Sequence, residues 1–363
     1  MSKLLGVNTP RLITGAPAII IPRMGDMTRL SDVIVPEMFS GYTQNYTTER
    51  SRLIQSGALV MSPQLTADLN GPGLIFQNPF FKDLDREDEE NISTDKGPDS
   101  TPHRITTGIE KQVRLSRNNS WGSADLVAAL IGRDPMDQII NLVGGYWVGR
   151  LQRAWIATMR GMFANNGLAT DDYHVMNDMT YDISGTAFQN GVTNFNAAAF
   201  IMANGTMGDR LDELSMVMVH SVVYQRMQLL NLIDFIPDAR GETMISTYQG
   251  KEVIIDDMMP NAGGVYETWI VARGASMMGA STPKVPTAIE RNEKANNGAG
   301  EEVLHNRVEW IIHPVGMSYI GDSPAGGPSN AATTNNLANG NSWRRAAPER
   351  KQIKIARLVT REF

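Results

Sequence analysis

Residues 134–167 read DPMDQIINLVGGYWVGRLQRAWIATMRGMFANNG, and this stretch predicts one long helix with a defined start and end. Asp134 offers an acceptor to the first free amides, Pro135 suits the first helical position, and Asp137 adds negative charge to the first turn. Apolar residues then recur at the three-and-four spacing of one helical face: Met136, Ile139, Ile140, Val143, Trp147, Leu151, Ala154, Trp155, Met159, Met162 and Phe163. Asn165-Asn166-Gly167 predicts a left-handed stop. At 1.5 Å per residue the helix would extend ~45 Å, which is long enough to form a spine.

Three glycines, Gly144, Gly145 and Gly149, interrupt this helix, and each costs ~1 kcal/mol relative to alanine in a helix interior. Such a cost predicts a structural reason for keeping them. They either permit close approach of another backbone or allow the helix to bend.

The composition describes a globular chain of 363 residues, of which 42% are hydrophobic. The absence of cysteine excludes disulfides, thiolate metal sites and cysteine nucleophiles. A formal net charge of -6 argues against a general nucleic-acid binder, although it permits local phosphate contacts. No apolar run reaches the ~18 residues of a membrane span, and the first residues do not resemble a signal peptide, so a cytosolic product without membrane contact is expected.

The first half of the chain predicts two extended features. Residues 1–58 place four prolines between short apolar patches, a pattern typical of an arm that crosses a surface. From about residue 73, strand-like alternation passes through a charged tip and returns over 105–115, which predicts a long β-hairpin. Because a lone hairpin is only marginally stable, we expect another subunit to cover it.

The second half predicts a separate α/β unit. A helix over 195–203, an apolar strand over 216–219 buried on both faces, a helix capped by His220-Ser221, and strands at 253–255 and 268–271 could form their own small core over 195–275. A last strand pair is expected between 307–313 and 353–359, on either side of a polar segment over 321–341.

The order of these elements resembles the major capsid (coat) proteins of tailed bacteriophages, which have the Hong Kong 97-type fold. Residues 250–260 (GKEVIIDDMMP) are similar to the strand and turn of that family's axial domain, and residues 307–319 (RVEWIIHPVGMSY) are similar to its returning peripheral strand. The resemblance implies an α+β fold with an N-terminal arm (1–58), an extended loop (59–118), a peripheral domain (119–194) with a spine helix over 134–165, an axial domain (195–275), and a return to the peripheral domain with C-terminal strands (276–363).

The resemblance also implies a structural function without catalysis or cofactor. Many copies would form the pentamers and hexamers of an icosahedral head in the virion, assembled in the host cytoplasm around double-stranded DNA that is bound without sequence specificity. The portal, a separate scaffolding protein and decoration proteins would be its partners, the scaffolding protein because no heptad pattern precedes the arm. An encapsulin-like compartment and an unrecognised hydrolase are the alternatives.

Candidate chemical sites are weak by comparison. The five histidines lie far apart, without metal-binding spacing, and His220-Ser221 lacks the G-x-S-x-G elbow of a nucleophile, so a helix cap is favoured. Asp256-Asp257 and Asp171-Asp172 are interpreted as turn residues rather than as a cation site. No spacing matches a phosphate-binding loop.

Charge predicts an assembly contact. Acidic residues dominate the hairpin tip, whereas basic residues dominate the C-terminal stretch. The candidate contact residues are Asp83, Asp85, Glu87, Asp88, Glu89 and Glu90 of the tip, and Arg344, Arg345, Arg350 and Lys351 of the C-terminal cluster, with Arg50 and Arg52 of the arm as others. We expect the acidic tip to meet a basic patch of a neighbouring subunit.

Overall fold

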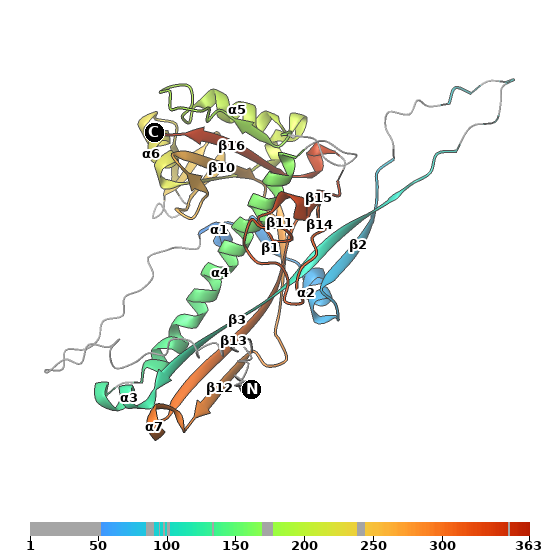
Figure 1. The fold of residues 1–363 in the computed structure, drawn as a ribbon. Helices are drawn as coiled ribbons and strands as arrows, with labels where there is room; N and C mark the ends of the chain where they lie inside the picture. The colour runs from blue at the N-terminus through green and yellow to red at the C-terminus, as the bar shows by residue number, and fades with distance from the viewer. Residues whose placement is uncertain are drawn as a thin grey trace, which may run out of the picture.

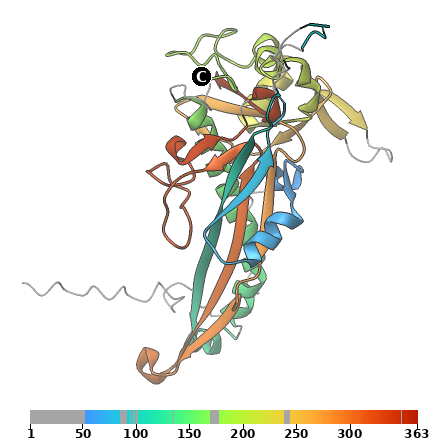
Figure 2. The ribbon, with the colours of Figure 1, turned by 90° about the vertical axis from the view of Figure 1, so that its right-hand side faces the viewer.

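The computed structural model describes residues 52–84, 91–93, 95–96, 99, 102–132, 134–168, 177–237, 244–347 and 349–363. They form an elongated body in which the long helix α4 (Pro135–Asn166) runs along one sheet and ends against a second (Figures 1 and 2). A β-hairpin projects from this body (Figure 1). Most of the arm predicted over 1–58 lies outside the described residues.

Helix α4 begins as the sequence predicts. Asp134 Oδ1 accepts a hydrogen bond from the amide of Met136 (2.8 Å), and Pro135 occupies the first helical position. The first half of the helix is largely exposed, whereas the second half, from Leu151 onward, is mostly buried. The helix therefore joins a solvent-facing segment to the centre of the core.

The predicted left-handed stop of α4 is wrong, because Gly167 has a φ of -83° and a right-handed conformation. The buried Asn165 donates from Nδ2 to the carbonyl oxygen of Trp343 (2.7 Å), and Asn166 donates to Asp178 Oδ1 (2.7 Å). These side-chain bonds tie the last turn to two other segments. The helix thus ends against its neighbours and does not need a left-handed residue.

A six-stranded sheet lies along α4 in the order β1-β11-β13-β3-β2, with β12 beside the first half of β13. Its strands are β1 (Leu59–Met61), β2 (Ile75–Phe81), β3 (Thr107–Ala124), β11 (Ser276–Ser281), β12 (Thr287–Asn292) and β13 (Glu301–Pro314). The long antiparallel pair β3 and β13 gives the body its length (Figure 2). Two short helices, α3 (Asp125–Ile131) and α7 (Ala295–Gly298), close the far end (Figure 1).

The predicted hairpin is confirmed for β2 and β3, which pair antiparallel from Ile75 opposite Val113 to Phe81 opposite Thr107. Residues 59–70, expected at the start of the extended loop, lie in the body instead. There β1 pairs parallel to β11, and helix α2 (Pro63–Asn70) packs against the sheet. Helix α1 (Arg52–Gln55) precedes them, and Leu53 is fully buried, so the described end of the predicted arm belongs to the core.

A second sheet of eight strands forms the other end of the body, in the order β4-β16-β10-β5-β8-β7-β6, with β9 beside β10. Its strands are β4 (Thr180–Asp182), β5 (Met216–Val219), β6 (Asp234–Pro237), β7 (Met244–Tyr248), β8 (Lys251–Ile255), β9 (Asn261–Ala262), β10 (Val265–Val271) and β16 (Ile355–Arg361). Helices α5 (Ala197–Gly205) and α6 (Ser221–Leu229) and the 3-10 helix η2 (Gly208–Glu213) accompany it.

Strand β5 is buried on both faces, as its continuous apolar run predicts. Met216 and Met218 join the core around α4, whereas Val217 and Val219 join a second core with residues of α5 and α6. Successive side chains of a strand point to opposite faces, so one strand contributes to both layers. The predicted α/β unit is therefore present, with α4 covering one face of its sheet.

The predicted pairing between 307–313 and 353–359 is wrong. Strand β13 pairs with β3, β11 and β12, whereas β16 pairs with β10 and with β4. Strand β16 alternates like β5, with Ile355 in the core around α4 and Leu358 in the core with α5. The C-terminal strand thus completes the sheet of the 195–275 segment.

The segment between β14 (Met317–Tyr319) and β15 (Trp343–Arg345) is polar in sequence but packed in structure. The two strands pair with each other. The 3-10 helix η3 (Gly340–Ser342) directly precedes β15, and the 3-10 helix η4 (Arg350–Gln352) lies between β15 and β16. Leu337 is fully buried in this segment and packs in the core around α4.

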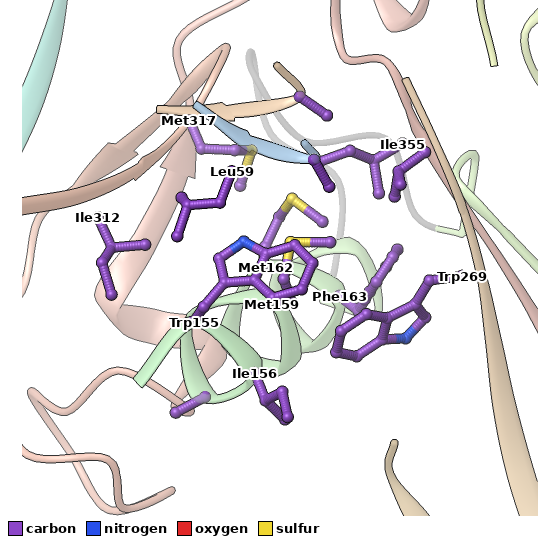
Figure 3. Packing of buried hydrophobic residues seen from close by; sticks show 14 of the residues in the cluster. Leu59, Trp155, Ile156, Met159, Met162, Phe163, Trp269, Ile312, Met317 and Ile355 are labelled. Carbon is purple, nitrogen blue, oxygen red and sulfur yellow. The ribbon is translucent and has the colours of Figure 1, made fainter. Parts of the chain in front are cut away.

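The main core gathers around the second half of α4 (Figure 3). Trp155, Met159, Met162 and Phe163 of the helix meet side chains from both sheets, among them Leu59, Trp269, Ile312 and Ile355, and Met317 of β14 joins them (Figure 3). Helix α4 therefore holds the two sheets together. Among the described helices, none has the length and apolarity that crossing a membrane requires.

Candidate assembly surfaces

The β2–β3 hairpin exposes one apolar face. Ile75, Pro79 and Phe81 alternate along β2, and Ile109 lies opposite Pro79 on β3. Phe81 is 73% exposed and Ile109 is 50% exposed. Pro79 has no amide to offer at the free edge of β2, which discourages a further strand from pairing there. The apolar face, rather than the strand edge, is thus the surface that a partner can cover.

Side chains on the opposite face of the hairpin pack against residues of the same chain. The ring of Phe80 covers Gly108 across the strands, and a Cβ at Gly108 would lie 2.8 Å from Phe80 Cε1. Closer to the body, Phe76 packs against a cluster that includes Leu65 of α2 and Ile311 of β13. The two faces therefore differ: the side chains of one pack within the chain, and the apolar side chains of the other are exposed to solvent.

The predicted acidic tip lies partly outside the described residues. Asp85, Glu87, Asp88, Glu89 and Glu90 are not described, whereas Asp83 is described and exposed. Two further acidic residues of the tip, Asp95 and Asp99, are also exposed.

The structure places Arg345 of the C-terminal cluster in the interior. Its side chain is 1% exposed, and Nη1 lies 2.5 Å from Asp178 Oδ2. Asp178 follows α4 in the chain, so the pair ties β15 to the end of the spine helix. Arg345 is therefore unavailable to a neighbouring subunit, which corrects its prediction as a contact residue.

Arg350 is likewise used within the chain. Its guanidinium donates to the carbonyl oxygens of Ile353, Ile355 (2.7 Å) and Asp178 (3.2 Å) and to Thr206 Oγ1 (3.0 Å). Burial lowers the pKa of Arg350 to about 10, although Asp178 opposes that shift. Arg350 is a structural residue, and its prediction as a contact residue is corrected too.

Three other basic residues of the C-terminal stretch have acidic partners in the same chain. Lys351 Nζ lies 2.6 Å from Asp209 Oδ1, at the surface. The remaining pairs are Lys354 with Glu213 (2.9 Å) and Arg357 with Glu267 (3.3 Å). Arg344 is partly exposed and also has an interaction within the chain. The acidic partners lie far from the C-terminal stretch in the sequence. The sequence alone therefore shows this stretch as an unpaired basic cluster.

The glycines of α4 divide into two kinds. At Gly144, Gly145 and Gly149, no described atom lies within 4 Å of a Cβ that would replace the glycine hydrogen. The predicted close approach therefore does not occur within the described part of this chain. At Gly161, by contrast, a Cβ would lie 2.5 Å from Trp343 Nε1 and would overlap the Leu337 carbonyl oxygen. Sequence reasoning missed Gly161, although its place among the buried residues of the apolar face is a usable signal.

The first half of α4 also exposes apolar side chains. Ile140 is 50% exposed, and Leu142, Tyr146 and Val148 are exposed beside the open glycines. Tyr146 is partly held by Trp121 of β3, with ring centroids 5.2 Å apart. This segment is a second apolar surface of the subunit.

His220 is a helix cap, as the sequence predicts. Its Nδ1 accepts a hydrogen bond from the amide of Val222 (3.3 Å), at the start of α6. Hydrogen bonding by Ser221 is the main cause that lowers the pKa of Asp257. The neighbouring acid, Asp256, is buried in a different environment.

Asp256 accepts hydrogen bonds from Gln152 Nε2 (2.9 Å) and from the amide of Met258 (2.8 Å), and the Leu53 amide also bonds to it. Burial raises the pKa of this carboxyl group. Asp256 thus joins α1, α4 and the turn after β8. Within the described part of the chain, no group of three or more His, Asp or Glu side chains is placed to hold a metal ion.

The comparisons with known proteins agree on one class of protein. No family model matches the sequence. The major capsid protein of Bacillus phage SPP1 is 33% identical over 341 residues, which cover 92% of this chain and 98% of that protein.

Two solved structures with a similar fold come from phage capsids. The cyanophage Pam1 capsid subunit has a TM-score of 0.55 at 9% identity and covers 93% of this chain and 99% of its own. The capsid of Ralstonia phage GP4 has a TM-score of 0.52 at 7% identity and covers 93% and 98%. At these identities the likeness concerns the fold alone.

Proposed function

This chain belongs to the phage major capsid proteins, and we propose that its copies assemble into a closed icosahedral head around the double-stranded DNA of a tailed phage. The role is structural, and the virion is where such a protein resides. The head would be built of pentamers and hexamers. The subunit would supply contact surfaces rather than a reaction, so no enzymatic activity is part of the proposal.

The observation that carries the proposal is the open face of the hairpin. Phe81, Ile109 and Ile75 are exposed on a projecting two-stranded ribbon, and among the described residues no further strand pairs with its free edge. Fully burying a large apolar side chain contributes ~1.5–3 kcal/mol, of which the isolated subunit gains only a part at these positions. A neighbouring copy that covers this face in every contact of a shell would recover that free energy.

We assign the two sheets to the two domains of the capsid fold. The six-stranded sheet with α4 corresponds to the peripheral domain, and the eight-stranded sheet with α5 and α6 corresponds to the axial domain at the centre of each capsomer. Strand β16 pairs with β10, so the axial domain includes the C-terminal strand in this assignment.

We retain the acidic tip as a contact and revise its partner. Arg345 and Arg350 are committed within the chain, which leaves Arg344, Lys351 and the basic residues of the arm as candidates. Lys351 is partly exposed and its pair with Asp209 lies at the surface, so the ammonium can also face a neighbouring subunit.

The partners proposed from the capsid role are a separate scaffolding protein, a portal and decoration proteins. Assembly would take place in the host cytoplasm. DNA would be enclosed without sequence-specific binding, which is compatible with a chain whose net charge is -6.

Electron microscopy of the protein co-expressed with its scaffolding protein tests the proposal. Closed shells of uniform diameter are the expected result. Particles that enclose a protein cargo in place of a scaffold or DNA would favour an encapsulin-like compartment. Small soluble oligomers at high concentration would contradict both.

A further inference from the structure

Polar contacts hold the base of the β2–β3 hairpin at one register level, where Asn78 of β2 lies opposite Glu110 of β3. On the β2 side, Gln64 of α2 donates from Nε2 to Asn78 Oδ1 (2.8 Å). On the β3 side, backbone pairing with β13 ends at Arg114, before Glu110 is reached. Beyond the last backbone pair between β3 and β13, side-chain hydrogen bonds therefore connect the hairpin to the body.

The Glu110 carboxylate uses both of its oxygens at this level. His313 of β13 donates from Nε2 to Oε2 (2.9 Å), and the amide of Gly316 donates to Oε1 (3.2 Å). The His313 side chain is 3% exposed, and its Nδ1 has no hydrogen-bond partner among the described residues. Because a carboxylate only accepts hydrogen bonds, this contact places a proton on His313 Nε2.

A second contact supports the same turn. Ser318 of β14 accepts a hydrogen bond at Oγ from the amide of Lys111 (3.2 Å) and donates from Oγ to the carbonyl oxygen of Ile109 (3.2 Å). These residues flank Glu110 in β3. Three consecutive residues of β3, Ile109 to Lys111, thus fasten the hairpin to the end of β13, the turn after it and β14.

We propose that Glu110 is the positioning residue that fixes the direction in which the hairpin leaves the body, acting through His313 and Gly316. The inference rests on the proposed function, because the exposed Phe81 and Ile109 must reach a neighbouring subunit in one orientation. Hydrogen bonds to an ionised carboxylate are about twice as strong as neutral ones. The contact of Gln64 with Asn78 is neutral and exposed, so the Glu110 side of the hairpin is the stronger attachment.

The test compares three variants in the unassembled subunit and in assembly with the scaffolding protein. Glu110→Ala removes both accepted hydrogen bonds, whereas Glu110→Gln keeps one acceptor oxygen. Glu290→Ala is the matched control, because Glu290 also pairs with a histidine on this sheet, His305 (3.2 Å), but is 69% exposed and lies away from the hairpin. Amide hydrogen exchange over 75–81 and 107–113 measures how firmly the hairpin is held.

Glu110→Ala should increase exchange of the hairpin amides by roughly tenfold or more, since one or two charge-assisted hydrogen bonds are lost. It should slow shell formation, measured by light scattering, while the midpoint of thermal unfolding of the body changes little. Glu110→Gln should rescue part of both effects, because it keeps one acceptor without the charge. Glu290→Ala should match the wild type in both measurements.

Hairpin exchange in Glu110→Ala equal to that of the wild type would overturn the inference. Faster exchange combined with shell formation at the wild-type rate would overturn it as well, because the fixed direction would then be irrelevant to assembly. If Glu110→Ala does not fold, unchanged hairpin exchange in Glu110→Gln gives the same negative answer. A wild type that forms no shells would contradict the proposed function, whereas the exchange comparison would still decide the role of Glu110.

Discussion

Gly161 of α4 lies directly against the backbone of Leu337, in a site where a Cβ would overlap the Leu337 carbonyl oxygen. Trp343 closes the same site and donates from Nε1 to that carbonyl oxygen (2.8 Å). The spine helix and the polar segment over 321–341 are thus in contact at a position where only glycine fits. The helix and that segment cannot separate without breaking this buried contact.

We predict that Gly161→Ala destabilises the subunit by at least ~1–3 kcal/mol, because overpacking forces the backbone of the segment to move. Gly145→Ala is the control. It should leave stability unchanged or raise it by up to ~1 kcal/mol, since no described atom lies within 4 Å and alanine favours the helix. Chemical unfolding of the two variants measures the difference, and equal stabilities would contradict the close contact at Gly161.

The Gly145 variant also bears on assembly. If Gly145→Ala is stable as a subunit but forms shells poorly, another subunit approaches α4 at this position. If it assembles normally, the open glycines serve the helix itself, for example by allowing it to bend. The two explanations given by the sequence are separated in this way.

Asp256 predicts a pH dependence of stability with a definite sign. Burial raises its pKa in the folded chain above the unfolded value of about 3.9. The folded state therefore binds the proton more readily, so the stability contributed by Asp256 is fully present below about pH 3.9 and is lost as pH rises through the folded pKa. The wild type should lose stability relative to Asp256→Asn over that window.

Urea unfolding of both proteins at a series of pH values measures this effect. The asparagine can keep the bond to Gln152 if the glutamine amide turns, because Gln152 Oε1 has no hydrogen-bond partner among the described residues. A stability difference between the two proteins that does not change with pH would show that Asp256 is not the group that titrates.

Local sequence information predicted the parts of the fold that local contacts determine. The neighbouring residues Asp134 and Pro135 mark the start of α4 in the sequence, and the continuous apolar run of β5 indicates a strand that is buried on both faces. The partner of β16 was not predictable in the same way, because strand pairing with β10 joins segments far apart in the chain. The register of β10 and β16 depends on which side chains the two cores bury, and the sequence of one strand does not contain that information.

The candidate contact residues show the same limit. Arg345 belongs to a run of basic residues, and its partner Asp178 lies 167 positions away. Composition therefore suggested a free basic surface where the folded chain has a buried ion pair. The open apolar face of the hairpin was predictable, because alternation along β2 already separates Phe81 from Phe80.

Charge reversal at the hairpin tip should impair assembly without unfolding the subunit. Glu87, Asp88, Glu89 and Glu90 are all replaced by lysine, which changes the sign of the tip and repels a basic partner surface. Shell formation by the wild type should also slow at high salt, because exposed charges are screened. Normal shells from the reversed variant, with the wild-type salt dependence, would mean that the tip is only solvated.

Phe81 lies on the exposed apolar face of the hairpin, opposite the face that packs within the chain. Phe81→Ser should leave the unfolding midpoint of the subunit nearly unchanged, because the side chain is 73% exposed. It should weaken assembly, since the covered aromatic would contribute ~1.5–3 kcal/mol at each contact, or roughly a tenfold to hundredfold change in association per contact. The concentration of protein needed for shell formation, measured by sedimentation, should rise accordingly.

Two variants of the same strand complete this test. Gln77→Ser changes an exposed polar residue on the face that carries Phe81 and should have little effect on either measurement. Phe76→Ser changes the other face, where the ring packs near Leu65 and Ile311 and lies 5.6 Å from the guanidinium of Arg114, so it should destabilise the subunit itself. If Phe81→Ser assembled like Gln77→Ser, no neighbouring subunit would cover this face, and the hairpin would have to act in assembly through its tip.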